Sequence, residues 1–320
     1  MNRISVAGAG AFGTALAIAL AKENNQVSLV ARNAQQANEM QTNRQNTKYL
    51  SGIRFPENLT ATDAGRGFHQ AKTVLLAIPT QNLRGYLEAH QALLSTKTCV
   101  LCCKGIEKKT GLLPSQIVTQ ILPKADVAVL TGPGFAFEIA HGLPTALTLA
   151  SFDNDSALQS QLSTQAVRLY LSNDPIGAQL GGALKNVIAI ACGIAIGAGL
   201  GESARAALMT RGYAEMMRLS VDMGANPLTL SGLSGFGDLA LTCTSLQSRN
   251  FSLGHALGQG GEIATGTTFE GVATARATWD LAQQRKIDMP LTQIVTAVLE
   301  GSLTISKAVD ALLSRPLKSE

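Results

Sequence analysis

The pattern of hydrophobic and polar positions in the first half of this chain predicts short buried strands separated by helices. Short apolar runs, rich in Val, Ile and Leu, recur between polar segments. Such continuous runs are typical of strands that are buried on both faces of a parallel sheet. The predicted strands are Arg3–Ala7, Gln26–Ala31, Asn58–Thr62, Thr73–Ile78, Thr98–Cys102, Asp126–Leu130, Thr145–Leu149 and Val167–Leu171.

Apolar residues at helical spacing lie between several of these strands. Strands that alternate with helices imply right-handed crossovers and a mainly parallel, doubly wound sheet. The helices predicted in this half are a segment that ends at Lys22, then Ala34–Arg44, Gln81–Leu94 and Leu113–Leu122.

From about Pro175 the strand-like runs vanish, and helical segments rich in glycine and alanine take over. The fold class is therefore α/β, with an N-terminal doubly wound parallel sheet and a C-terminal all-α domain. We place the domains at residues 1–178 and 179–320. The helices predicted in the second half are Ala183–Ile196, Arg205–Met223, Leu228–Leu233, Thr274–Gln284, Leu291–Leu299 and Ser306–Ser314.

The first strand leads directly into a glycine-rich turn that opens a helix. Gly8, Gly10 and Gly13 give the spacing GxGxxG, which in this strand–turn–helix context is the fingerprint of a dinucleotide-binding (Rossmann) domain. Gly8 is expected to permit the tight turn, Gly10 to let the backbone approach a pyrophosphate, and Gly13 to let the helix pack closely. The N–H groups at the helix start would then face the pyrophosphate charge.

Arg32 ends the second predicted strand, where a site that prefers NAD usually carries an acidic residue for the ribose 2′-hydroxyl. A cation at this position suits a 2′-phosphate instead. The sequence therefore favours NADP(H), with NAD(H) possible. A solvated arginine at a strand end is the alternative interpretation.

Composition narrows the class of protein further. The chain has 320 residues, of which 46% are hydrophobic and 15% charged, and its net charge is +4. This net charge is too small to indicate a protein that binds nucleic acid. The longest apolar run, Val187–Leu200, is shorter than the ~20 residues that span a bilayer, and the N-terminal segment lacks the pattern of a signal peptide. We expect a cytoplasmic enzyme with no membrane insertion.

The five cysteines are scattered and mostly flanked by apolar residues, which is typical of reduced core thiols. We therefore expect no metal site.

Charged side chains in apolar surroundings mark the candidate site. Lys104 follows a buried strand, and Lys185 stands inside an apolar helical segment, where a charge must be paired or face a polar site. Asp238 lies between a glycine and an apolar run, so it could orient a lysine. Ser248 could cap a following helix, whose first N–H groups and the Arg249 side chain would then surround a phosphate. Each of these residues also has a purely structural interpretation. Lys185 could be a lysine that extends its charge to solvent, Asp238 only a helix cap, and the Ser248–Arg249–Asn250 run only a turn.

Seven motifs in order, GAGAFGTALA, AIPTQNLR, CKGIE, TGPGFA, GALKNVIAIACGIAIG, GFGDLALTCTS and SRN, resemble those of the bacterial NAD(P)-dependent glycerol-3-phosphate dehydrogenases. The resemblance runs almost from end to end. It implies reversible reduction of dihydroxyacetone phosphate to sn-glycerol 3-phosphate, supplying glycerophospholipid synthesis. It also implies a Rossmann domain, a helical domain, a cytoplasmic location and a homodimer.

The resemblance also implies roles for single residues. Lys185 matches the proton-transferring, catalytic lysine of the family. The substrate-binding residues would be Lys104, Gly132, Gly134, Lys185, Asn186, Asp238, Ser248, Arg249 and Asn250. The cofactor-binding residues would be Gly8, Gly10, Ala11, Phe12, Gly13, Arg32, Lys104, Ala136, Arg249 and Glu270.

Three positions depart from the family pattern. The family more often has Ser where this chain has Gly134 and Ala11, and often Trp where it has Phe12. Two hydroxyl contacts are therefore replaced by backbone, but no charged group is lost.

The reaction needs a general acid for the alkoxide that forms at the substrate carbonyl, and none of the four histidines has a suitable context. A free lysine is a poor acid at neutral pH, so we expect burial and the charge of Lys104 to lower the pKa of Lys185.

Two other functions remain open from the sequence. A related two-domain dehydrogenase that acts on a 3-hydroxy acid or a sugar acid would share the lysine–asparagine helix, but the Ser248–Arg249–Asn250 run favours a phosphorylated substrate. A non-catalytic NADP(H)-sensing module would not need Lys104 and Lys185.

Overall fold

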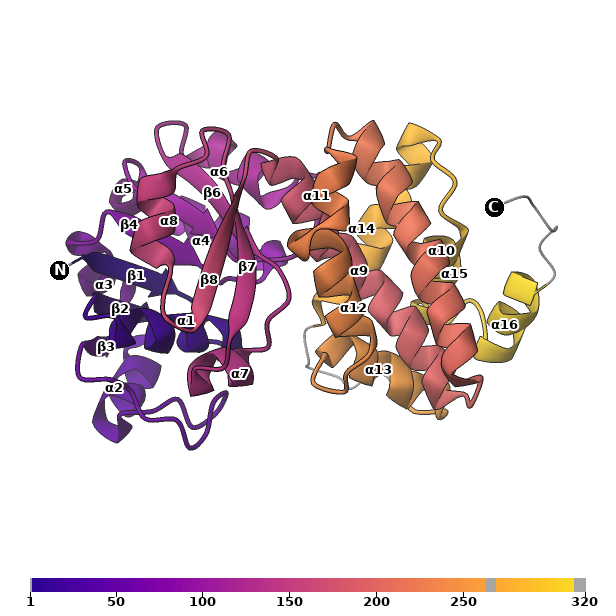
Figure 1. Cartoon of the computed structure of the whole chain (residues 1–320), viewed down its shortest axis with the longest axis horizontal. Coiled ribbons are helices and arrows are strands. Elements are labelled where there is room, and N and C mark those ends of the chain that lie inside the picture. Colours follow the sequence, from indigo (N-terminus) through magenta and orange to yellow (C-terminus); the bar gives the residue numbers. More distant parts are fainter. Residues whose placement is uncertain (1, 263–268, 314–320) are drawn as a thin grey trace.

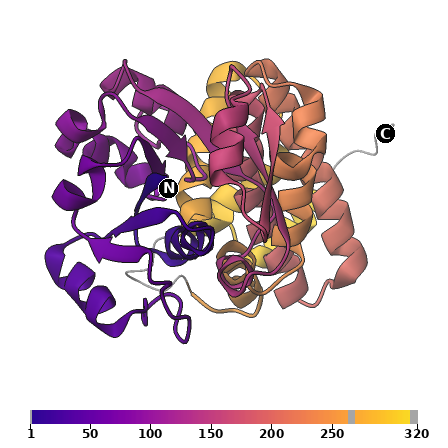
Figure 2. The ribbon, with the colours of Figure 1, turned by 60° about the vertical axis from the view of Figure 1, so that its left-hand side comes forward.

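The computed structural model describes residues 2–262 and 269–313. The molecule has two halves that lie side by side, a sheet flanked by helices and a bundle of helices (Figure 1). Turning the molecule shows the helical half packed against one side of the sheet half (Figure 2).

One eight-stranded sheet forms the first half, in the order β3-β2-β1-β4-β5-β6-β7-β8. The strands are β1 (Arg3–Ala7), β2 (Gln26–Val30), β3 (Leu59–Thr62), β4 (Thr73–Leu76), β5 (Thr98–Leu101), β6 (Asp126–Thr131), β7 (Thr145–Ala150) and β8 (Val167–Ser172). Neighbouring strands are parallel except β6 and β7, which pair antiparallel. The strands that carry the fingerprint and Lys104 therefore belong to the parallel part of the sheet.

Helices connect these strands. They are α1 (Ala11–Lys22), α2 (Ala34–Asn43), α3 (Ala64–His69), α4 (Thr80–Ala89), α5 (Gln91–Leu94), α6 (Pro114–Ile121), α7 (Ala136–His141) and α8 (Ser156–Leu162).

The second half is helical throughout its described residues. Its helices are α9 (Pro175–Gly197), α10 (Gly201–Asp222), α11 (Pro227–Ser231), the π-helical turn η1 (Leu233–Gly237), α12 (Asp238–Cys243), α13 (Arg249–Gly258), α14 (Glu270–Arg285), α15 (Pro290–Leu299) and α16 (Ile305–Leu313).

The predicted fold class is confirmed, and each predicted strand lies within two residues of an observed one. The segment predicted as one helix over 81–94 is two helices that meet at His90. Helices α3, α7, α8 and α12 were not predicted, because six or seven residues are too few to show a helical period. Ser314, the end of the last predicted helix, lies outside the described residues.

Helix α9 is the central element of the helical half. It packs against α10, α12, α13, α14 and α15. Among the described helices it is the one long and apolar enough to cross a membrane, but 83% of its most apolar window is buried inside the protein. The sequence had suggested a shorter apolar segment. The predicted domain boundary after residue 178 stays a prediction, and α9 begins at Pro175.

One residue of the sheet half belongs to the core of the helical half. Ile106, in the loop after β5, is fully buried and packs in a cluster with α9 residues that include Leu180 and Leu184. The loop that carries Lys104 is thereby tied to both halves.

Candidate active site

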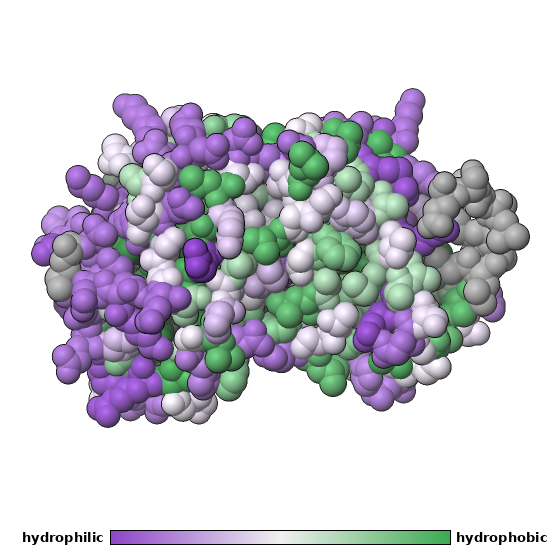
Figure 3. Space-filling model, viewed as in Figure 1, coloured by the Kyte–Doolittle hydropathy of each residue, from purple (hydrophilic) through white to green (hydrophobic). Residues whose placement is uncertain are grey.

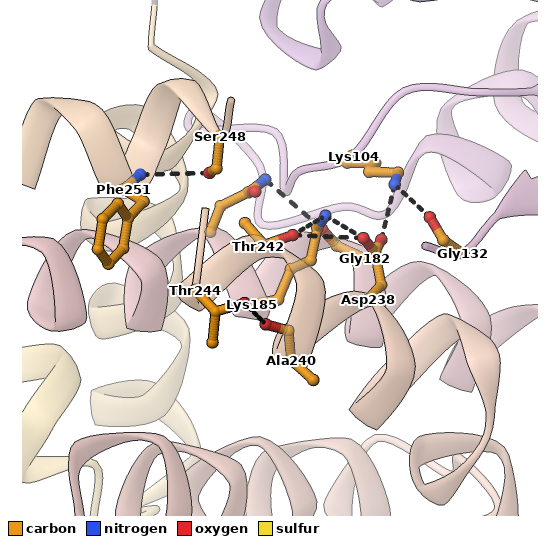
Figure 4. A network of polar contacts seen from close by, with 11 residues as sticks. Lys104, Gly132, Gly182, Lys185, Asp238, Ala240, Thr242, Thr244, Ser248 and Phe251 are labelled. Atoms are coloured by element: carbon orange, nitrogen blue, oxygen red, sulfur yellow. Dashed lines mark hydrogen bonds and ion pairs between the residues drawn. The ribbon is translucent and has the colours of Figure 1, made fainter. Parts of the chain in front are cut away.

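The site lies at the seam between the two halves, where the loops after β5 and β6 meet α9 and α12. Asp238, the first residue of α12, is 2% exposed and accepts hydrogen bonds from two lysines. Lys104 Nζ lies 2.7 Å from its Oδ2, and Lys185 Nζ, from α9, contacts its Oδ1 (Figure 4). One buried carboxylate therefore binds ammonium groups from both halves of the molecule.

A hydroxyl completes this network. Lys185 Nζ donates to Thr242 Oγ1 at 2.7 Å, and Thr242 Oγ1 lies 3.3 Å from Asp238 Oδ1. An ammonium has three donors, and these contacts use two of the three on Lys185. The third remains for a substrate oxygen.

The charge balance lowers the pKa of Lys185. Burial of the side chain lowers it most, the attraction of Asp238 opposes this, and the nearby charge of Lys104 lowers it again, so that the pKa is about 8. The expectation from the sequence, that burial and Lys104 would act together, is confirmed. A lysine with this pKa exchanges protons near neutral pH.

Lys104 spans the seam. Besides Asp238, its Nζ donates to the carbonyl oxygen of Gly132 at 3.2 Å and lies 5.9 Å from the centre of the Phe12 ring. The fingerprint helix, the loop after β6 and the helical half thus converge on one ammonium group. This is the arrangement expected of a residue that contacts both a cofactor and a substrate.

The start of α13 supplies a second polar group of residues. Ser248 caps this helix, because its Oγ accepts from the N–H of Phe251 at 3.2 Å. Asn250 Oδ1 accepts from the N–H of Gly271 at 3.2 Å, which ties α13 to the start of α14. Arg249 is exposed and interacts electrostatically with Glu270.

Glu270 begins α14 among the cations of the site. Burial raises the pKa of its carboxyl group, and Arg249, Lys104 and Lys185 partly oppose the shift. The structure therefore places Lys104 and Lys185 within electrostatic reach of both Asp238 and Glu270, and Arg249 within reach of Glu270.

The turn after β1 fits a dinucleotide. Gly8 has φ +103°, and a Cβ there would stand 2.4 Å from the carbonyl oxygen of Ala77; a Cβ on Gly13 would stand 2.1 Å from Gly8 O. Both glycines are therefore required by a turn or a close approach, as predicted. Gly10 faces open space within 4 Å and has no side chain to cap α1, so the first N–H groups of that helix can bind a phosphate.

Asn46 holds this turn from the other side. Its buried Nδ2 donates to the carbonyl oxygen of Ala9 at 3.0 Å and to Thr14 Oγ1 at 2.8 Å. Arg32 is exposed just beyond the end of β2.

The loop after β6 contributes backbone. Gly132 has φ +140°, and a Cβ on Gly134 would stand 2.9 Å from Thr145 Cγ2. A side chain at position 134 would therefore crowd Thr145, and the chain is packed around a glycine there. Ala136 begins α7.

Sequence reasoning missed Thr242, whereas the role of Asn186 in substrate binding stays a prediction. Thr242 lies four residues after Asp238 on α12, so the helical period could have signalled it. The Asn186 amide points back along α9, with Nδ2 3.5 Å from Gly182 O.

A dinucleotide-binding sheet and a buried lysine on an all-α domain define the class of two-domain NAD(P)-dependent dehydrogenases. Two family models match the chain: the NAD-dependent glycerol-3-phosphate dehydrogenase N-terminus over residues 3–157 and the C-terminus over residues 174–310.

Relatives match the whole chain. A glycerol-3-phosphate dehydrogenase [NAD(P)+] of Ruegeria sp. (strain TM1040) is 55% identical, over 99% of each chain. That of Cereibacter sphaeroides is 54% identical, over 99% of this chain and all of the relative. The crystal structure of glycerol-3-phosphate dehydrogenase from Coxiella burnetii is 38% identical, covers 98% of both chains and superposes with a TM-score of 0.92.

This chain belongs to the NAD-dependent glycerol-3-phosphate dehydrogenase family. It is an oxidoreductase, and its cofactor is a nicotinamide dinucleotide, NAD or NADP.

Proposed function

We propose that the protein catalyses the reversible reduction of dihydroxyacetone phosphate to sn-glycerol 3-phosphate with NAD(P)H. The observation that carries the proposal is the buried Lys185, held by Asp238 and Thr242 with one donor left over. Relatives that are 54–55% identical over their full length bear the name of this enzyme.

A bound nicotinamide cofactor would supply the hydride that reduces the carbonyl carbon of the ketone. Lys185 gives its proton to the carbonyl oxygen as that oxygen gains the electron pair of the C=O π bond, and a neutral lysine remains. Asp238 and Thr242 fix the direction of the Lys185 side chain, and Lys104 stabilises the developing negative charge.

The substrate phosphate is held at the start of α13. The helix N-terminus capped by Ser248, the exposed Arg249 guanidinium and the Asn250 amide together provide N–H donors for a dianion. Gly132 and Gly134 contribute backbone groups from the facing loop. Binding energy gained at the phosphate orients the carbonyl beside Lys185.

The cofactor is held along the fingerprint. Gly8 shapes the turn and Gly13 lets α1 pack closely, so that the backbone from Gly10 through Ala11 to Phe12 would face the pyrophosphate. Ala136, Lys104, Arg249 and Glu270 would also contact the cofactor. Arg32 at the end of β2 favours the 2′-phosphate of NADP(H) over the free hydroxyl of NAD(H).

An assay of the purified protein with dihydroxyacetone phosphate tests the proposal. We expect oxidation of NADPH, and of NADH less efficiently, and a loss of roughly 10²- to 10⁴-fold in kcat for Lys185→Ala with nearly unchanged NADPH binding. Arg249→Ala should raise KM for the phosphorylated ketone steeply. Normal turnover by Lys185→Ala would contradict the assigned general acid.

We further infer a cytoplasmic homodimer that inserts in no membrane, binds no nucleic acid and supplies glycerophospholipid synthesis. Support comes from the family membership and from the burial of α9, its one long apolar helix among the described residues.

A further inference from the structure

Two motifs of the sequence, AIPTQNLR and CKGIE, have residues to which the mechanism assigns no role. The structure brings them together, because α4 lies against the loop that follows β5. We call residues 104–112, between β5 and α6, the lysine loop, since Lys104 is its first residue. Gln81 and Arg84 of α4 contact this loop at two successive places.

Gln81 bonds the backbone of the lysine loop with both ends of its amide. Its Nε2 donates to the carbonyl oxygen of Ile106 at 2.8 Å, and its Oε1 accepts from the N–H of Lys108 at 3.0 Å. The Gln81 amide thus satisfies one backbone acceptor and one backbone donor of the loop, as a neighbouring strand would. The Ile106 carbonyl lies two residues from Lys104, so this bond fixes the backbone that immediately follows the lysine.

Arg84 forms a bidentate ion pair with Glu107, the residue that follows Ile106. Its Nε and Nη2 lie 2.9 Å from Glu107 Oε1 and Oε2, and the Glu107 side chain is 7% exposed. Thr110 Oγ1 also donates to this carboxylate at 2.5 Å. The hydrogen bonds from Arg84 are the main reason that the pKa of Glu107 lies below its usual value. A bidentate pair restricts orientation as well as distance.

The far side of the lysine loop is held by the helical half. Ile106 is buried in the helical core, and a Cβ on Gly105 would stand 3.0 Å from Thr80 Oγ1 and 3.2 Å from Thr274 Oγ1. Residues 105–107 are therefore fixed between α4 and the helices, and Lys104 extends from this fixed segment toward Asp238.

We propose that Gln81, together with the Arg84–Glu107 pair, positions the backbone of the lysine loop so that Lys104 reaches Asp238 and the substrate. Gln81 and Arg84 are positioning residues that touch neither substrate nor cofactor. The kinetic part of the proposal rests on the proposed function.

The test is a double-mutant cycle with Gln81→Met and Lys104→Met. Gln81→Met keeps the length of the side chain and removes both hydrogen bonds. We expect a fall of roughly 10- to 100-fold in kcat/KM for dihydroxyacetone phosphate, because a shift of about 1 Å at a reacting group costs this much. In the Lys104→Met background the same change should cost less than about twofold, since its effect passes through Lys104.

The matched control is Gln91→Met. Gln91 Nε2 also donates to a backbone carbonyl, that of Ile121 at 2.9 Å, but Gln91 lies in α5 away from the lysine loop. This variant should keep wild-type kcat/KM. If Gln81→Met does not fold, Gln81→Glu takes its place, because a carboxylate removes the bond to the Ile106 carbonyl and keeps the acceptor for Lys108.

Crystal structures of the wild type and of the Gln81 variant give a readout that does not depend on turnover. We expect the contact of 2.7 Å between Lys104 Nζ and Asp238 Oδ2 to be lost in the variant. An unchanged contact, or an equal fall in kcat/KM with and without Lys104, would overturn the proposal. Failure of the wild type to turn over dihydroxyacetone phosphate would count against the proposed function alone.

Discussion

Lys185 is the residue in which burial and charge most directly determine chemistry. Its pKa is about 8, lowered by burial and by Lys104. In the direction of ketone reduction Lys185 must carry a proton, so kcat/KM should be constant below about pH 8 and fall about tenfold per pH unit above it. In the direction of alcohol oxidation the neutral lysine is the base, so the rate should instead rise as the pH approaches 8.

Substitution of Lys104 and of Asp238, the two charged neighbours of Lys185, should move the pH at which kcat/KM begins to fall in opposite directions. Lys104→Met removes a like charge and should shift it to higher pH, whereas Asp238→Asn removes an opposite charge and should shift it to lower pH. The pH profiles of kcat/KM for the wild type and both variants check this. If kcat/KM begins to fall at the same pH in both variants, a group other than Lys185 causes the fall.

At the residue scale, we expect Arg32 to set the preference between NADP(H) and NAD(H). Its side chain is exposed just beyond β2, so Arg32→Ala should leave the fold intact. We expect KM for NADPH to rise roughly 10-fold or more through loss of a charge-assisted hydrogen bond. KM for NADH, which has no 2′-phosphate, is the internal control and should change little. Equal changes for both cofactors would contradict a role at the 2′-phosphate.

Single residues show how far sequence reasoning reaches into the site. Lys104, Lys185 and Asp238 could be singled out because charges are costly in apolar segments. Gln81 could not, because a glutamine on a helix is common and its importance depends on what packs against it. Thr242 could be found only through Asp238, which lies one helical turn before it on α12.

At the scale of elements, the crossing of α9 and α13 decides how the helix that carries Lys185 lies against the helix that carries Arg249. The helices approach so closely that a Cβ on Gly254 would stand 2.1 Å from the carbonyl oxygen of Ile190, and one on Gly193 would stand 2.1 Å from that of Phe251. Both residues lie further along the helices that carry Lys185 and Arg249, so this contact sets the relative position of the two cations.

Gly254→Ala should therefore separate α9 from α13. We expect the free energy of unfolding to fall by about 1–3 kcal/mol, as for an overpacked core, and kcat/KM to fall with it. Gly85→Ala is the control, because Gly85 lies in α4 with open space around it and should gain up to about 1 kcal/mol. Denaturant titrations of the two variants measure the difference. Equal stabilities would show that the helix crossing adapts.

Elements differed in how well the sequence predicted them. Central strands such as β4 and β5 are buried on both faces and leave continuous apolar runs. The edge strands β3 and β8 alternate in burial, but they too were found. The antiparallel pairing of β6 with β7 was not foreseen, since a run of apolar residues carries no direction. The short helices around the site are set by caps and packing, which leave little periodic signal.

At the scale of the whole molecule, the surface supports the expected homodimer. Hydrophilic residues dominate the sheet half, and more hydrophobic ones lie over the helical half (Figure 3). Leu228 of α11 is 78% exposed, and Phe236 of η1 is 51% exposed with its ring against Tyr213. Apolar side chains that are this exposed are typical of an interaction surface when they gather in a patch.

Light scattering after gel filtration should therefore give twice the chain mass of 33.4 kDa. Leu228→Glu should shift the protein toward the monomer by placing a charge in the interface. Phe152→Glu is the control, because Phe152 is 71% exposed on the sheet half and should not affect association. A wild-type mass of one chain would exclude the dimer.

The sequence alone determined the class of fold, the dinucleotide site and which charged residues belong to the candidate site. Each of these follows from a pattern of residues that are close together along the chain. Apolar runs specify strands, glycine spacing specifies the turn at Gly8, and a charge in an apolar segment demands a partner. Each is set by neighbours along the chain.

Only the tertiary structure decided which partners those charges have. Lys104 and Asp238 are 134 residues apart, yet they form the ion pair that joins the two halves beside Lys185. Their meeting depends on the packing of α12 against α9, on Ile106 in the helical core and on the hold of α4 on the lysine loop. Packing between distant segments fixes such contacts, and no local pattern of residues encodes it.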